Sequence, residues 1–136
     1  MTFAELKNFM KEVRWGALAT TDGKKVSVRP MGSLAWVGKE LWCGAEKGQE
    51  KISQLAKVPF AEYCFASPDG EHVRISGPCR VSTSDEDKVK LFSLVLSLHK
   101  FYETPYDKAF VVLRMRPTKI QQFIHKTYEY KNIKIK

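Results

Sequence analysis

The chain has 136 residues, of which 43% are hydrophobic and 28% are charged, and its formal net charge is +8. This length and composition indicate one globular domain and exclude disordered, collagen-like and low-complexity proteins. No apolar run approaches the roughly 18 residues of a membrane span, and the N-terminus lacks the features of a signal peptide. We therefore expect a single cytoplasmic domain over residues 1–136, with no membrane partner and a positive charge that attracts anions.

Cysteine and histidine are few and are spaced without a metal-binding pattern. Cys43, Cys64 and Cys79 form no Cys-x-x-Cys pair, and their apolar surroundings predict inert buried thiols. The three histidines lack helical pair spacing, so no metal site is expected. Nucleophile and phosphate-loop motifs are also missing from the sequence. If the protein is catalytic, a cofactor is expected to supply the reactive group, and the catalytic residues stay unknown.

The elements predicted along the chain are mostly short strands. Thr2 and Glu5 form a capping box ahead of an apolar helical pattern, which predicts a helix over residues 3–13. A second, short helix ends before Pro59, and the longest helix is expected from Ser84 to Phe101. Alternating patterns and turn residues predict strands at 15–20, at 26–29 with its continuation at 34–37, and at 40–45, 60–66, 72–82, 108–116 and 120–124. Residues 126–136 form a basic C-terminal tail or a further strand.

This order of elements favours a mainly β fold with flanking helices. Six or seven short strands with tight turns are typical of a small closed or partly closed antiparallel barrel. A doubly wound parallel sheet would need a crossover helix after nearly every strand, and that pattern is absent from the sequence.

One group of residues has the chemistry of a phosphate site. Arg29 lies in a strand beside Pro30 and Gly32, which allow another group to approach the backbone. Lys47 and Lys51 flank a glycine-containing loop that enters a helix, where free amide groups favour anions. Two lysines at a helix start are also common on an ordinary solvated surface, and the residues alone leave both interpretations open.

The order of these segments resembles the pyridoxamine 5′-phosphate oxidase-like, FMN-binding split-barrel family. The resemblance covers residues 13 to 83 and rests on the ordered set rather than on one motif. Its segments are Val28-Arg29-Pro30-Met31-Gly32, Leu41-Trp42-Cys43, Lys47-Gly48-x-x-Lys51, Leu55-x-x-x-Pro59 and Val73-Arg74-Ile75-Ser76-Gly77.

The resemblance implies a six-stranded antiparallel split barrel that forms a homodimer, with FMN held between the subunits. It assigns phosphate contacts to Arg29, Lys47 and Lys51, and it places the backbone of Pro30 and Met31 along the flavin ring. His72 falls where some members use a Gln that reaches the flavin, and a surface histidine is the alternative. The implied cofactor-binding set is Arg29, Pro30, Met31, Gly32, Lys47, Gln49, Lys51 and His72.

Several positions depart from the family pattern. Ala45 replaces a hydroxyl residue of many relatives, and Glu50 stands where a second cation is common, which raises the question of weakened FMN binding. The C-terminus also lacks the oxidase's arginine–histidine substrate motif. We therefore expect an FMN-dependent oxidoreductase of an unknown small molecule rather than a true pyridoxamine 5′-phosphate oxidase.

Other functions remain open at this point. The same barrel could hold a deazaflavin or haem. A non-catalytic basic β-barrel could instead bind single-stranded nucleic acid, since Tyr128 and Tyr130 alternate with lysines. This aromatic–basic segment is confined to one terminus, so nucleic acid is not the expected partner.

Overall fold

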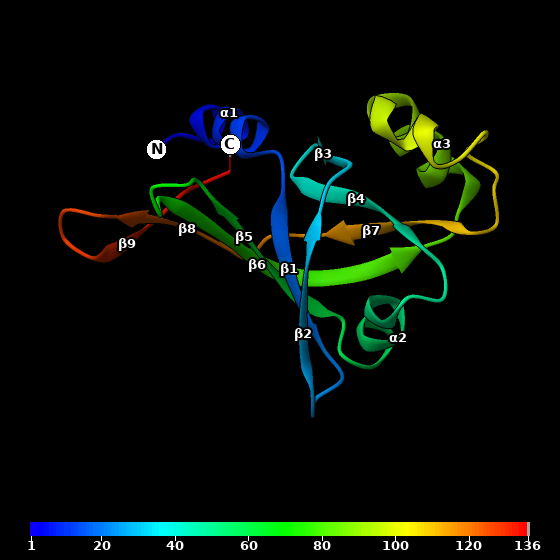
Figure 1. The fold of residues 1–136 in the computed structure, drawn as a ribbon, viewed down its shortest axis with the longest axis horizontal. Helices are drawn as coiled ribbons and strands as arrows, with labels where there is room; N and C mark the ends of the chain where they lie inside the picture. Colours follow the sequence, from blue (N-terminus) through cyan, green and yellow to red (C-terminus); the bar gives the residue numbers. More distant parts are fainter. Residues whose placement is uncertain (136) are drawn as a thin grey trace.

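A computed structural model describes residues 1–135 of the chain (Figure 1). Three α-helices and one 3₁₀ helix flank a curled antiparallel sheet of nine strands. The helices are α1 (Phe3–Val13), α2 (Glu50–Lys57), α3 (Asp85–Leu94) and the 3₁₀ helix η1 (Leu96–Lys100). The strands are β1 (Gly16–Thr21), β2 (Val26–Met31), β3 (Leu34–Val37), β4 (Glu40–Glu46), β5 (Phe60–Ala66), β6 (His72–Ser82), β7 (Phe110–Met115), β8 (Lys119–Ile124) and β9 (Glu129–Asn132).

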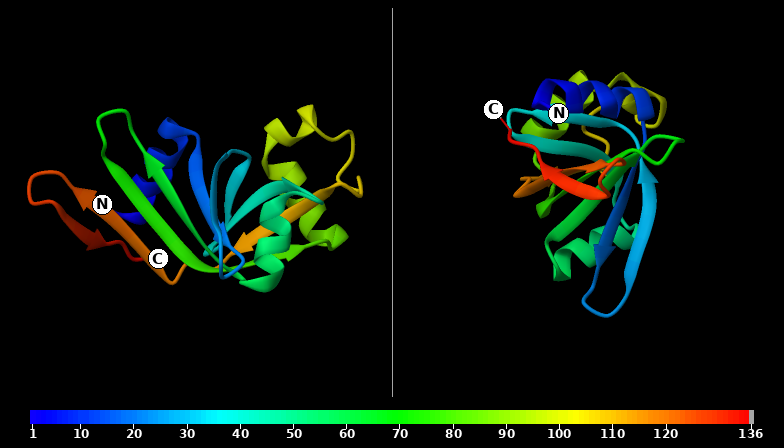
Figure 2. Two further views of the ribbon diagram at one scale, coloured as in Figure 1. Left: turned by 60° about the horizontal axis from the view of Figure 1, so that its bottom comes forward. Right: turned by 90° about the vertical axis from the view of Figure 1, so that its left-hand side faces the viewer.

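The sheet curls into a split barrel, which confirms the expected fold class. Its main path runs β2-β1-β5-β6-β7-β4-β3, and β8 and β9 branch from β6 (Figure 2). The nine strands exceed the six that the resemblance implies, because β3, β8 and β9 add short strands beside the others. Part of the basic C-terminal segment is therefore a strand, β9, while Lys136 lies outside the described residues.

Strand β6 changes its partner halfway along its length. Residues 73–76 pair with β8, whereas residues 79–82 pair with β7. The chain between β7 and β8 crosses β6 at Gly77, where an added Cβ would lie 2.2 Å from the backbone oxygen of Arg116. Only glycine allows this close approach, so Gly77 forms the corner at which the sheet divides.

Strand β7 is buried on both of its faces. Val111, Leu113 and Met115 belong to the main core, which also contains Leu6 and Met10 of α1. The alternate residues, Phe110 and Val112, belong to a second core beneath α3 and η1. The α3–η1 segment thus covers the outer face of the sheet, and α1 packs against the interior.

The capping box of α1 is confirmed, but the long helix predicted from Ser84 to Phe101 is wrong. Its α-helical part ends at Leu94, and Val95 is extended, with φ −120° and ψ 100°. This break lets both Val95 and Leu98 reach the second core and leaves Phe101 73% exposed. Apolar periodicity could not reveal the break, because one extended residue shifts the phase of the pattern that follows it.

Arg114 of β7 joins α3 to β4. Its Nε donates to Glu40 Oε1 at 2.9 Å, its Nη1 donates to Asp87 Oδ2 at 2.9 Å, and its guanidinium lies 4.6 Å from the centre of the Trp42 ring. The bond from Arg114 lowers the pKa of Glu40. Burial raises the pKa of Asp87, but bonds from Ser82 and Arg114 outweigh it and the pKa is lowered.

We expect Arg114→Met to lower the free energy of unfolding by about 2 kcal/mol at neutral pH, because it leaves two carboxylates without their cation. Lowered carboxyl pKa values stabilise the fold above about pH 4, and this contribution is lost as pH falls through the folded-state values. The difference between wild type and variant should therefore shrink in acid. Urea unfolding at several pH values measures it, with the exposed Arg116→Met as control; a pH-independent difference would contradict this account.

Candidate functional site

An open groove of about 1230 Å³ lies where the end of α1, the β2–β3 connection, β4, the start of α2 and η1 meet. Its volume exceeds that of a typical ligand pocket, so it has room for a cofactor-sized molecule. Five of the eight residues in the predicted cofactor set line it, namely Pro30, Met31, Gly32, Gln49 and Lys51.

At two glycines of the groove a side chain packs directly against the backbone. A Cβ at Gly32 would lie 2.8 Å from the ring of Trp15, and a Cβ at Gly44 would lie 2.5 Å from Cδ2 of Leu98. Trp15 therefore packs directly on the backbone of Gly32, although 61% of the residue is exposed. A large aromatic side chain that stays exposed at a groove can stack on a planar ligand.

Lys51 is a buried cation at the α2 end of the groove. The residue is 7% exposed, and its Nζ donates to Oε1 of Gln49. Among residues 1–135, no carboxylate lies within ion-pair distance of this ammonium group. Burial, and then the nearby positive charge of Arg29, lower the pKa of Lys51. A bound anion would offset both effects, which makes this end of the groove suitable for a phosphate.

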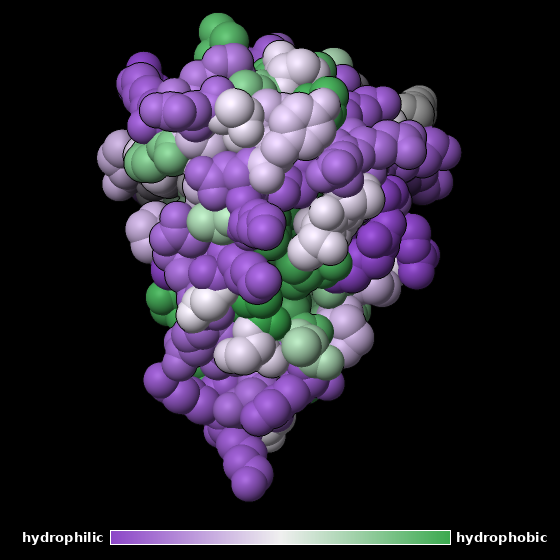
Figure 3. All heavy atoms as spheres, turned by 90° about the vertical axis from the view of Figure 1, so that its right-hand side faces the viewer, coloured by the Kyte–Doolittle hydropathy of each residue, from purple (hydrophilic) through white to green (hydrophobic). Residues whose placement is uncertain are grey.

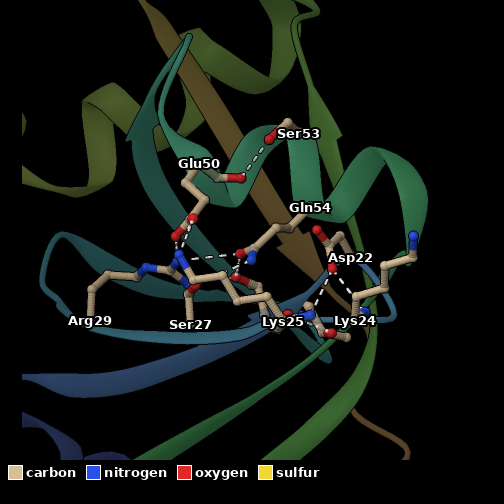
Figure 4. Close-up of polar contacts among 10 residues, drawn as sticks. Asp22, Lys24, Lys25, Ser27, Arg29, Glu50, Ser53 and Gln54 are labelled. Atoms are coloured by element: carbon tan, nitrogen blue, oxygen red, sulfur yellow. Dashed lines mark hydrogen bonds and ion pairs between the residues drawn. The ribbon is translucent and has the colours of Figure 1, made fainter.

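Arg29 does not line the groove but lies in a network between β2 and α2 (Figure 4), and its charge contributes to the lowered pKa of Lys51. Its Nη1 donates to Thr20 Oγ1 at 2.6 Å and to the carbonyl oxygen of Leu18 at 3.3 Å. Its Nη2 lies 3.4 Å from Gln54 Oε1 and 3.6 Å from Glu50 Oε1. Desolvation lowers the pKa of Arg29, and the charge of Glu50 opposes that shift.

Gln54 fixes this network from α2. The side chain is buried, its Oε1 accepts from Thr20 and Arg29, and its Nε2 donates to Ser27 Oγ at 3.2 Å. These contacts bridge α2 to both strands of the β1–β2 hairpin. The guanidinium of Arg29 is therefore held in one position near the start of α2.

Two residues of the predicted set lie elsewhere. Lys47 is exposed in the turn between β4 and α2, and it does not line the groove. His72 stands at the start of β6, where its ring stacks on Phe123 and its Nε2 lies 2.8 Å from the hydroxyl of Tyr130. Gln49 and Lys51 therefore line the groove, whereas Lys47 and His72 lie outside it.

The thiols show no sign of nucleophilic activation. Cys43 and Cys79 are buried, and desolvation raises the pKa of each thiol to about 12. Cys64 is partly buried, and burial raises its pKa as well.

Over the described chain, no group of three histidine, cysteine or acidic residues could hold a metal ion. No described helix is long and apolar enough to cross a membrane.

The sequence interpretation missed parts of the groove. Trp15 and Glu46 line it. So do four basic residues from α1, its C-cap and η1, namely Lys7, Lys11, Arg14 and Lys100. Apolar side chains of α3 such as Val89 and Leu94 are also exposed, and Figure 3 shows apolar patches within the mainly hydrophilic face that carries α3 and α2. One available signal was the spacing of Lys7 and Lys11, four residues apart and therefore on one face of the predicted helix.

Comparisons with known proteins agree with this architecture. The sequence matches the family described as pyridoxamine 5′-phosphate oxidase over residues 2–124. A comparison with curated protein sequences gives no match.

Solved structures share the fold at low sequence identity. A NimC/NimA family protein from Clostridium acetobutylicum is 24% identical, with a TM-score of 0.78 over 95% of this chain and 90% of that chain. A protein related to general stress protein 26, from the same organism, is 12% identical, with a TM-score of 0.81 over 97% and 93% of the two chains. A pyridoxamine 5′-phosphate oxidase-related, FMN-binding protein from Nostoc punctiforme is 13% identical, with a TM-score of 0.74 over 98% and 96%.

The family match spans nearly all the strands and includes both sides of the groove, from Trp15 and Gly32 to Lys51 and η1. The structural neighbours independently reproduce the same fold. The chain therefore belongs to the pyridoxamine 5′-phosphate oxidase family.

Proposed function

We propose that the protein is an FMN-binding oxidoreductase that acts on a small molecule in the cytoplasm. The observation that carries this proposal is the buried ammonium group of Lys51, which lacks a carboxylate partner among the described residues and lines a cofactor-sized groove. A terminal phosphate would supply the missing negative charge. The family match and the relative described as FMN-binding support FMN over other phosphates.

The described residues fit such a ligand at both of its ends. Lys51 and Gln49 would bind the phosphate, with Arg29 as a second cation near the start of α2. The backbone of Pro30 to Gly32 would lie along the ring, beside the exposed indole of Trp15. FMN, when bound, supplies reversible hydride or electron transfer.

The protein's part in the reaction is to bind, orient and exclude water. Met31, Leu98 and Tyr102 are buried residues that line the groove, so they give it an apolar wall. The hydroxyl of Tyr102 lies 3.4 Å from Glu46 Oε1, and burial raises its pKa to about 12, so it stays protonated near neutral pH. The carboxylate of Glu46 accepts from the hydroxyl of Tyr102 and so orients this proton donor at the groove.

The groove is open, and we propose that a second copy of the chain closes it in a two-fold homodimer. Val26 and Val28 lie on β2 at the edge of the sheet and are 72% and 66% exposed. Edge strands with exposed β-branched residues pair or pack readily with another chain. A partner on this strand would lie next to Pro30 and the groove.

Equilibrium titration with FMN tests the proposal. We expect quenching of flavin fluorescence to saturate at about one FMN per chain, and riboflavin to bind roughly several hundredfold more weakly because it lacks the phosphate and every contact to it. Light scattering on the same sample at micromolar concentration should give the mass of two chains. Absence of saturable FMN binding would overturn the proposed function, and a monomeric mass with FMN bound would overturn the dimer.

A further inference from the structure

The proposed phosphate site has two cations, Lys51 and Arg29. Among the described residues, Glu50 is the one carboxylate within ion-pair distance of either of them, and its partner is Arg29. Its Oε1 lies 3.6 Å from Nη2 of Arg29, and its Oε2 lies 3.0 Å from Nζ of Lys25 (Figure 4). Resting on the proposed FMN site, we propose that Glu50 is a built-in counter-ion that competes with the flavin phosphate for Arg29. FMN is then an exchangeable ligand rather than a permanently held cofactor.

The geometry makes Glu50 the replaceable partner of Arg29. The side chain of Arg29 is 20% exposed, and its other contacts are neutral oxygens of Thr20, Leu18 and Gln54. The side chain of Glu50 is 49% exposed and lies in the first turn of α2. The arginine is therefore fixed by the sheet and by Gln54, whereas the carboxylate can turn into solvent and keep its bond to Lys25.

The charges explain why this competition weakens phosphate binding. Arg29 directly precedes Pro30, and Glu50 lies between Gln49 and Lys51, so the ion pair of Arg29 and Glu50 stands at the edge of the groove that these neighbours line. The positive charge of Arg29 also lowers the pKa of Lys51, as expected where two cations face one dianion site. The carboxylate of Glu50 neutralises one of these two charges in the protein without ligand. An incoming phosphate must separate Glu50 from Arg29 and then remain near a like charge, which reduces the net gain from the second cation.

The contact is built by residues far apart in sequence. Lys25 follows the turn between β1 and β2, and its bond to Glu50 places the carboxylate over β2 rather than toward the groove. A hydrogen bond from Ser27, and then the bond from Lys25, lower the pKa of Glu50 and keep it charged. Glu50 and Lys51 are thus adjacent on α2: without ligand the first neutralises Arg29, while the second lines the groove without a carboxylate partner among the described residues.

The experiment compares FMN and riboflavin binding to wild type, Glu50→Gln and Glu86→Gln. Glu86 is an exposed acid in the first turn of α3, so its variant removes the same charge at a comparable helix position. We expect Glu50→Gln to tighten FMN binding about fivefold and to slow FMN dissociation, because Arg29 becomes free for the phosphate. Riboflavin affinity should be the same for all three proteins.

Each outcome decides between the two proposals. If wild type binds FMN but Glu50→Gln does not bind it more tightly, the counter-ion proposal fails and the proposed function stands. Equal tightening of FMN and riboflavin also overturns the counter-ion proposal, since the effect would then not involve the phosphate. If none of the three proteins binds either flavin, both proposals fail.

Discussion

Replacement of Lys51 by methionine should weaken FMN binding by about 1.5 to 3 kcal/mol, which is the loss expected for a charge-assisted bond to a phosphate. Methionine keeps much of the side-chain volume but removes the ammonium group. Riboflavin, which has no phosphate, should bind the variant as it binds wild type. Fluorescence titration of both ligands measures the two affinities.

The control for this prediction is Lys57→Met, which removes an exposed lysine from the last turn of the same helix. It should change FMN affinity little. Thermal unfolding of Lys51→Met should show no loss of stability, because the variant removes a cation whose burial already lowers its pKa. Unchanged FMN affinity, or equal losses for FMN and riboflavin, would remove Lys51 from the phosphate site.

Gly77→Ala should lower the free energy of unfolding by about 3 kcal/mol, at the upper end of the range for overpacking. The added methyl group would meet the carbonyl oxygen and carbonyl carbon of Arg116 at 2.2 and 3.0 Å, and backbone cannot give way as a flexible side chain can. Two backbone bonds flank this point, from Arg116 N to Pro78 O at 2.9 Å and from Thr118 N to Ser76 O at 2.9 Å. Any shift of the crossing chain would strain both.

Gly32→Ala is the matched control, since the three atoms nearest to its methyl group all belong to the ring of exposed Trp15. We expect a loss below about 1 kcal/mol there, because the indole can move into solvent. Urea unfolding of the two variants gives the comparison. Similar losses in both would show that the crossing at Gly77 tolerates a side chain.

Local sequence signals predicted most of the elements. The turns at Asp22-Gly23 and Asp69-Gly70 were identifiable because glycine alone readily adopts the positive φ found there, 94° at Gly23 and 91° at Gly70. Alternation along residues 110–115 likewise predicted β7. It could not show that this strand is buried on both faces, because the second core depends on how α3 and η1 fold back over it.

The candidate site was predictable only in part. Chain order placed Pro30 to Gly32 and Lys51 in one site, and the structure brings them to one groove. The pairing of Glu50 with Lys25 is invisible in the sequence, since three strands, β2 to β4, separate the two residues. Trp15 was assigned to a strand, and its place over Gly32 follows from the packing of α1.

The sheet order has a consequence for synthesis on the ribosome. Strand β4 ends at Glu46, yet its long partner β7 begins only at Phe110. At about 5 to 20 residues per second, β4 waits roughly 3 to 13 seconds with β3 as its one strand partner in the described chain. Leu98, which packs on Gly44 in the groove, is synthesised late in this interval, so the groove is incomplete for most of it. A flavin bound at the proposed site would therefore stabilise the finished protein, but it would find no complete site on the nascent chain while β4 waits.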